Sequence, residues 1–264
     1  MNKKSALLLC LVAASSVSFW FSVEPWIKNP FQFSHINTWL KPLISLGLFS
    51  ALIGLSFLII RNGLIKFAVS IIAGLPFLFV FDFNQFYLIA FALIVLLHSS
   101  AAKDISKQAT ERIKIDIREI MGHGLPSVIT PILLLISFAF FFSPEVQKSA
   151  SQQELPPTAK QVMSRVIGGF LGGEIEQLPP QEQKVTEELI VDKVFDQFNQ
   201  VLSPYFKFLP PVLAFGLFLI LQGLRFIFVW TGAAMAVILF WALRKTGFIK
   251  TKILQKEAEE IEPV

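Results

Sequence analysis

The sequence predicts an all-α polytopic membrane protein, and two observations predict this class. Hydrophobic residues make up 54% of the 264 residues and charged residues only 16%, whereas soluble domains carry about 25% charged residues. The last apolar run, Phe208 to Leu243, contains a single charged residue, Arg225. At about 1.5 Å rise per residue, one straight helix of that length overshoots the roughly 30 Å of bilayer hydrocarbon. The run therefore predicts either two membrane segments that meet at 222–225 or one span plus a half-span.

The N-terminal part, residues 1–98, is expected to hold four spans. Lys3 and Lys4 precede an apolar run over 5–23, which resembles a signal peptide but is long enough to cross a bilayer. We interpret this run as an uncleaved anchor, with cleavage as the alternative. After a loop over 24–42, further spans are expected at 43–60, 64–81 and 85–97. The second span carries small residues that allow close helix approach, namely Gly47, Ser50, Ala51 and Gly54.

Residues 99–124 form the first hydrophilic segment and are predicted to be cytoplasmic. Arg112 to Arg118 alternates charged and apolar residues, a period of two that is typical of a strand. Phe248 to Ile253 has a similar composition. If both share a compartment, they predict a possible short cytoplasmic β-ribbon. A break at Met121 to Pro126 would then lead into the fifth span, 125–142.

Residues 143–207 are predicted to be a small extracytoplasmic helical insert. The segment is acidic and is divided by two Pro-Pro pairs. Two amphipathic helices are expected within it, the first with a face of Val162, Val166, Ile167 and Phe170, the second with a stripe of Val185, Leu189, Phe195, Phe198 and Leu202. Short helices of this kind bury little alone, so they are expected to lie against each other and on the membrane surface or a partner.

The distribution of basic residues predicts the orientation. With the N-terminus cytoplasmic, Lys3, Lys4, Arg61, Lys66 and the basic residues of 99–124 lie on the cytoplasmic side, as the positive-inside rule requires. The tail, 244–264, is also basic next to the membrane and is expected to be cytoplasmic. We therefore predict six full transmembrane helices, the sixth at 227–243, with a re-entrant or half helix at 210–222. Seven spans, with the tail outside, are the alternative.

Gln222 and Arg225 form the candidate intramembrane polar site, because they interrupt the C-terminal membrane block, 208–243. Ionisable residues within membrane segments often mark function. The plainer interpretation is that Arg225 is a turn residue whose side chain reaches the interface. Asp82 and Asn84 are similarly expected to form a turn at a helix end.

The sequence predicts no catalytic, cofactor or metal site. The histidines, His35, His98 and His123, lack metal-ligand spacing, and no catalytic or phosphate-binding motif occurs. Gly168, Gly169, Gly172 and Gly173 follow no strand and are interpreted as a flexible or close-packed spot. The single cysteine, Cys10, excludes an intrachain disulfide. No basic block suggests nucleic-acid binding.

Two functions are compatible with this pattern. The preferred hypothesis is a non-catalytic scaffold or subunit of a cell-envelope assembly in the plasma (inner) membrane, in contact with the lipid bilayer and with a protein partner through residues 157–203. The alternative is a small transporter or channel that uses the broken segment 208–243. Broken helices mark transport sites, although usually in two corresponding positions, and this chain has only one such pattern.

Overall fold

A computed structural model describes residues 3–28, 37–81, 83–111, 115–152, 160, 163–164, 166 and 180–249. All regular structure in these ranges is helical. The helices are α1 (Lys3–Lys28), α2 (Asn37–Ile59), α3 (Gly63–Val80), α4 (Gln85–Glu111), α5 (Ile117–Phe141), α6 (Pro144–Gln152), α8 (Pro180–Leu202), the 3₁₀ helix η1 (Ser203–Phe208), α9 (Leu209–Gly223) and α10 (Arg225–Lys245).

Seven helices within the described residues are long and apolar enough to cross a membrane. They are α1, α2 from Leu40, α3, α4, α5, the combined stretch of η1 and α9, and α10. This confirms the predicted all-α polytopic membrane fold.

The chain divides into two compact units. The first, the bundle unit, comprises Met1–Pro25, Ser34–Ile136 and Phe218–Val264. The second, the insert unit, comprises Trp26–Phe33 and Ser137–Leu217. The division cuts α1, α5 and α9, so each of these helices contributes to both units.

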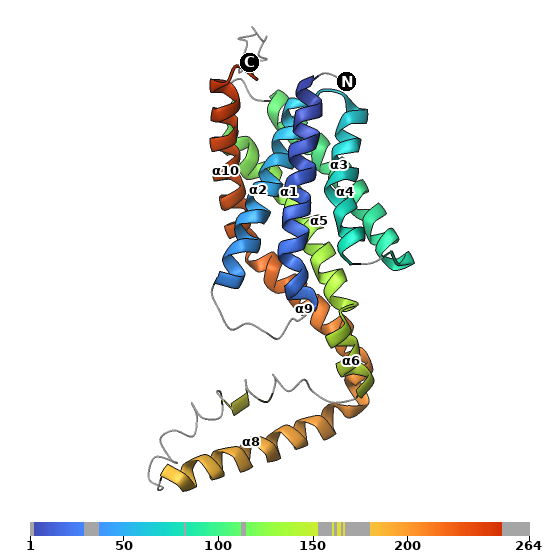
Figure 1. Cartoon of the computed structure of the whole chain (residues 1–264), viewed down its shortest axis with the longest axis vertical. Helices are drawn as coiled ribbons and strands as arrows, with labels where there is room; N and C mark the ends of the chain where they lie inside the picture. Colours follow the sequence, from blue (N-terminus) through green and yellow to red (C-terminus); the bar gives the residue numbers. More distant parts are fainter. Residues whose placement is uncertain are drawn as a thin grey trace, which may run out of the picture. The chain divides into compact units, whose positions relative to one another are not determined.

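The core of the bundle unit includes the first helix. Within this unit α2 contacts α3, α4 and α10, and α3 contacts α4 (Figure 1). Leu8 and Val12 of α1 are fully buried. Trp20 is also buried, and its Nε1 donates to the carbonyl oxygen of Ala73 in α3 at 3.3 Å. Both halves of α1 therefore pack into the bundle.

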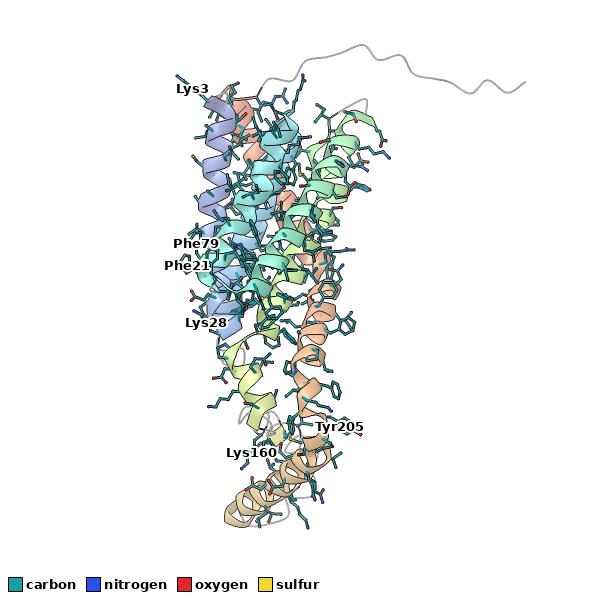
Figure 2. The ribbon with its side chains drawn as sticks, turned by 90° about the vertical axis from the view of Figure 1, so that its right-hand side faces the viewer. Lys3, Phe21, Lys28, Phe79, Lys160 and Tyr205 are labelled. Carbon is teal, nitrogen blue, oxygen red and sulfur yellow. The ribbon has the colours of Figure 1, made fainter. Side chains whose placement is uncertain are left out.

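Small residues bring α2 and α10 together. A Cβ atom on Gly47 would lie 2.8 Å from Cγ2 of Thr231, and one on Gly232 would lie 2.8 Å from Oγ of Ser50. Only hydrogen at these positions permits this approach, which is the contact expected from small residues in membrane helices. On the outer surface, Phe21 of α1 and Phe79 of α3 are exposed (Figure 2). Apolar side chains on the outside suit a lipid environment.

The strand prediction is wrong for Ile115 to Arg118. Ile115 and Asp116 lie in no regular structure, and Ile117 and Arg118 begin α5. The carboxylate Oδ1 of Asp116 accepts from the backbone N–H of Arg118 at 2.9 Å and of Glu119 at 3.3 Å. Such a cap satisfies backbone donors at a helix start, so it outweighs the alternation of side chains. Residues 112–114 and 250–253 lie outside the described residues.

Several helices are longer than predicted. α4 continues to Glu111, and α5 is helical through the expected break at 121–126. The expected loop over 24–42 is helical at 24–28 and 37–42. α6 was not predicted from the sequence. The sequence does contain a helix-start signal, because a serine, Ser143, directly precedes Pro144. In the structure the Ser143 hydroxyl accepts from the N–H of Val146 at 3.3 Å, as a helix cap does.

The insert unit has a small core. Val146 of α6, Val191 of α8 and Phe206 of η1 are buried. Both α6 and α8 contact η1, so the 3₁₀ helix connects the two longer elements of the unit. A helix, α8, is confirmed at the position of the second predicted amphipathic helix.

Candidate functional site

The predicted break in the C-terminal block is a kink without chain reversal. Leu224 keeps a right-handed helical conformation, with φ −84° and ψ 0°. Its N–H donates to the carbonyl oxygen of Ile220 at 3.0 Å, and its own carbonyl accepts from the N–H of Ile227 at 3.0 Å. An antiparallel helix pair needs a loop of several residues, so the end of α9 and the start of α10 do not form a hairpin.

The two predicted site residues lie within one turn of this kink. Nη1 of Arg225 donates to Oγ1 of Thr130 in α5 at 3.4 Å, a long hydrogen bond. The side-chain oxygen Oε1 of Gln222 is buried and has no hydrogen-bond partner in the part of the chain that the structure describes. The kink therefore carries one guanidinium that contacts α5 and one buried amide acceptor.

Three polar side chains from other helices contact a single turn of α5, Ser127 to Thr130, which we call the polar turn. Arg225 binds Thr130 as described, and Oγ of Ser127 donates to Oδ2 of Asp104 at 3.2 Å. Nε2 of His98 lies 3.1 Å from the carbonyl oxygen of Val128. Two helix-weakening prolines, Pro126 and Pro131, flank the turn.

His98 is fully buried between α4 and α5. A backbone carbonyl only accepts, so Nε2 must carry the proton and Nδ1 presents a lone pair. Nδ1 is buried and, within the described ranges, has no hydrogen-bond partner. His123 instead binds the Glu119 carbonyl of its own helix at 2.9 Å. The described residues contain no group of three potential metal ligands.

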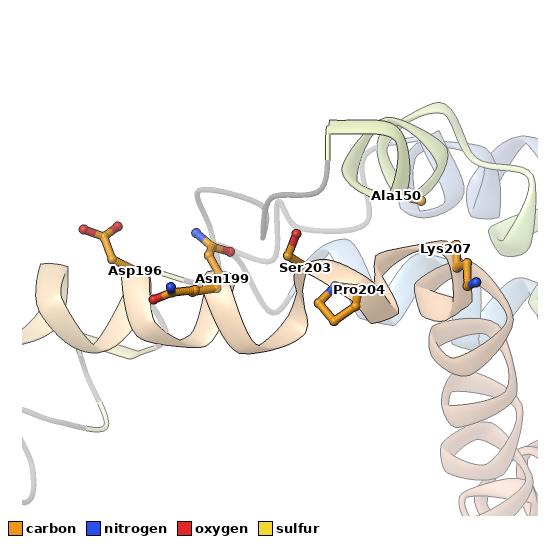
Figure 3. Close-up of a pocket in the computed structure, with 7 residues that line it drawn as sticks. Ala150, Asp196, Asn199, Ser203, Pro204 and Lys207 are labelled. Atoms are coloured by element: carbon orange, nitrogen blue, oxygen red, sulfur yellow. The ribbon is translucent and has the colours of Figure 1, made fainter.

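The insert unit contains an open groove of about 690 Å³ between α6 and the α8–η1 segment. Figure 3 shows Asp196, Asn199 and Ser203 projecting from one side of α8 and η1, where Ala150 of α6 lies. The groove is lined by Ala150, Asp196, Asn199, Gln200, Ser203, Pro204 and Lys207. Most of these side chains can form hydrogen bonds, and the two charged ones have opposite signs.

Other predicted positions have mixed outcomes. The side-chain oxygen of Asn84 accepts from the N–H of Phe86 at 3.2 Å, which agrees with a helix-end role. On α8, Leu189 and Phe198 are exposed rather than packed. Of the four residues on the apolar face of the first predicted amphipathic helix, only Val166 is described, and it is exposed. The remaining predicted positions, Asp82, Val162, Ile167, Phe170 and the glycines of 168–173, lie outside the described residues.

The fold and these sites define a class: an all-α, multi-pass membrane protein with polar contacts between helices of its bundle and a groove in its insert unit. Comparison with protein-family models, curated proteins and solved structures gives no match.

Proposed function

We propose that this chain is a non-catalytic membrane protein, a scaffold or a subunit of a cell-envelope assembly. The observation that carries the proposal is the division into two compact units, one of which holds the open polar groove. In this function the bundle unit anchors the chain, and the insert unit binds a partner protein through residues that include part of 157–203.

The groove chemistry supports a polar protein segment as the partner. Asp196 and Lys207 offer opposite charges, and Gln200 offers both a donor and an acceptor. Interfaces that mix charge and hydrogen bonding gain specificity rather than raw affinity. A scaffold that holds a defined subunit requires such specificity.

We also propose the plasma (inner) membrane as the location, a cytoplasmic N-terminus and six full crossings. Nζ of Lys4 donates to the carbonyl oxygen of Phe248 at 2.5 Å and lies 5.3 Å from the centroid of its ring. Contact between the start of α1 and the residues after α10 supports termini on one side, and therefore an even number of crossings. The kink at Leu224 supports the same count, because α9 does not turn back before α10.

A pair of reporter fusions tests this orientation. A reporter that is active only in the cytoplasm is fused after Val264, and in a second chain a reporter that is active only outside is inserted after Gln152. Both are expected to be active. Activity of an outside-only reporter at Val264 would establish an odd number of crossings and contradict the proposal.

Photo-crosslinking tests the docking function. A photo-reactive residue at Gln200 in the groove is expected to give one discrete adduct with a second protein in cells. The same residue at Leu64, an exposed apolar position on α3, serves as the control and should give none. Ala150→Trp fills the groove and should abolish the Gln200 adduct. If only the free chain is recovered, or if the adduct survives Ala150→Trp, the groove is not the docking site.

A small transporter or channel is the second candidate function. It is favoured by the polar turn of α5, where a proline-flanked turn meets Arg225 at the kink between α9 and α10. In this function Arg225→Ala should reduce ion or solute flux into vesicles of the purified chain at least several-fold. Arg244→Ala, an exposed change at the end of α10, should not. If vesicles with the unsubstituted chain, with Arg225→Ala or with Arg244→Ala all show the same flux as empty vesicles, this candidate is excluded.

A further inference from the structure

The α8–η1 segment exposes four large apolar side chains along its C-terminal half. Phe198 is 50% exposed, Val201 68%, Tyr205 62% and Phe208 53%. Their spacing alternates between three and four residues, which keeps them near one side of a helix. In a water-soluble helical unit this side would face the core. We call these four residues the apolar side of α8–η1.

Several polar residues of the same segment face the rest of the insert unit. Oδ1 of Asp192 pairs with Nζ of Lys160 at 2.5 Å. Asp196, Asn199 and Ser203 project toward the groove shared with α6 (Figure 3). At these positions the arrangement is the reverse of that in a water-soluble helix, because the carboxylates of Asp192 and Asp196 face their own unit while the four residues of the apolar side are exposed. What covers the apolar side must itself be apolar.

The apolar side continues into a candidate membrane span. α9 begins immediately after Phe208, and the exposed Val212 and Phe215 extend the same three-and-four spacing within the insert unit. η1 and α9 together form one stretch apolar and long enough to cross a bilayer. The apolar side of α8–η1 is thus continuous with the exposed side of α9. If α9 enters the bilayer, the apolar side lies close enough to contact the same bilayer.

The residue types at this junction match a membrane–water interface. Tyr205 is exposed at the junction (Figure 2), and Nζ of Lys207 lies 5.0 Å from the ring centroid of Phe208. Tyrosine has an apolar ring and a polar hydroxyl, and lysine can extend its ammonium group toward water, so both are common at this depth. The acidic residues of α8 give no attraction to anionic lipids.

We infer that the apolar side of α8–η1 lies in the bilayer interface, at the boundary between headgroups and acyl chains of zwitterionic lipid. α8 is then an interfacial helix that holds the groove at the membrane surface, with its polar side toward water. The inference concerns the side of α8 away from the groove, and it does not depend on whether the groove binds a partner.

Nitroxide accessibility tests this inference in the full chain. Cys10, which is exposed, is replaced by serine, and a single spin label is placed at Val201→Cys or at Asp196→Cys. The labelled chains are reconstituted in phosphatidylcholine vesicles. The label at Val201 should be relaxed several-fold more by oxygen, which concentrates in lipid, than by a water-soluble nickel chelate. The label at Asp196 is the matched control on the polar side and should show the opposite preference.

Each other result overturns the inference. A label at Val201 that prefers the nickel chelate faces water. A label shielded from both reagents is covered by protein, either another part of this chain or a partner. Spectral broadening at Val201 that disappears on dilution with unlabelled chain identifies a second copy. None of these results changes the expected crosslink from Gln200, so failure here is distinct from failure of the docking function.

Discussion

The bundle unit holds most of the large side chains that are fully buried, whereas the α8–η1 segment of the insert unit exposes several of its large apolar ones. Of the largest fully buried side chains in the described residues, Trp20, Phe19, Phe49, Phe57 and Phe77 belong to the bundle unit, and Phe206 belongs to the insert unit. In the insert unit, Phe198, Val201 and Tyr205 are exposed instead. Within the described residues, the large buried side chains are therefore concentrated in the bundle unit.

The difference also appears in the polar contacts. In the bundle unit, the buried Oγ of Ser16 donates to the backbone carbonyl of Ala73 on another helix at 2.7 Å. In the insert unit, the ion pair between Lys160 and Asp192 joins side chains that are 47% and 52% exposed. Water and salt screen the interaction between exposed charges, so an exposed ion pair adds little stability, whereas a buried contact is screened much less. Substitutions should therefore affect the two units very differently.

The largest effect is expected at Trp20. Its ring contacts Phe19, Phe77 and Phe81, with centroid distances of 4.9, 5.1 and 6.2 Å. Trp20→Ala leaves a cavity among these rings and should lower the free energy of unfolding in detergent by about 3–5 kcal/mol.

The neighbouring residue is the control for this prediction. Phe21 is 58% exposed, so Phe21→Ala should change the free energy of unfolding by less than about 0.5 kcal/mol. Denaturant or thermal unfolding of both variants measures the contrast. Similar losses for the two variants would mean that α1 is not packed as described, and would weaken the comparison between the units.

A smaller effect is expected for one added methyl group in α5. A Cβ atom on Gly124 would lie 2.5 Å from Cγ1 of Ile105, which is fully buried. Gly124→Ala should therefore lower the free energy of unfolding by about 1–3 kcal/mol, the usual cost of overpacking. Gly122 lies two residues earlier on the same helix, and a Cβ atom there would have no described neighbour within 4 Å.

Gly122→Ala is thus a matched control with the opposite sign. It adds a methyl group in open space and improves helix propensity, so it should raise the free energy of unfolding by up to about 1 kcal/mol. Both variants can be followed by thermal unfolding in the same detergent. A stabilising Gly124→Ala would show that α4 and α5 are further apart than the structure has them.

The membrane spans were predictable from sequence because the length of an apolar run is a property of the run itself. The expected spans at 43–60 and 64–81 coincide closely with the membrane parts of α2 and α3. Helix ends were less predictable. The cap formed by Asp116 decides where α5 begins, and it competes with an alternating pattern that joins no sheet in the described residues.

The candidate site was predictable only in part, for a similar reason. Arg225 and Gln222 were found because a charge and an amide within an apolar run are visible in the sequence. Thr130 was not found, because it is 95 residues from Arg225 and reaches it only through helix packing. The same holds for His98 and Val128. Nothing in the local sequence indicates which turn of α5 receives these contacts.

The smallest effect is expected for the ion pair of the insert unit. Nζ of Lys160 and Oδ1 of Asp192 are 2.5 Å apart, but both side chains are about half exposed. A double-mutant cycle with Lys160→Met and Asp192→Asn should give a coupling below about 1 kcal/mol, measured by amide hydrogen exchange in α8. The coupling should fall further in 1 M salt, where the screening length is about 3 Å.

The pair of Lys107 and Glu111 on α4 provides the reference, with side chains 72% and 56% exposed and the charged atoms 3.7 Å apart. For an exposed pair one turn apart, a coupling of about 0.3–0.5 kcal/mol is expected. If the Lys160–Asp192 coupling matches this reference, α8 is not held in the insert unit by its charges. Its position then depends on the core around Val191 and on what contacts its apolar side. A salt-insensitive coupling of several kcal/mol would reverse that conclusion. It would mean that contacts within the insert unit are enough to hold α8 in place.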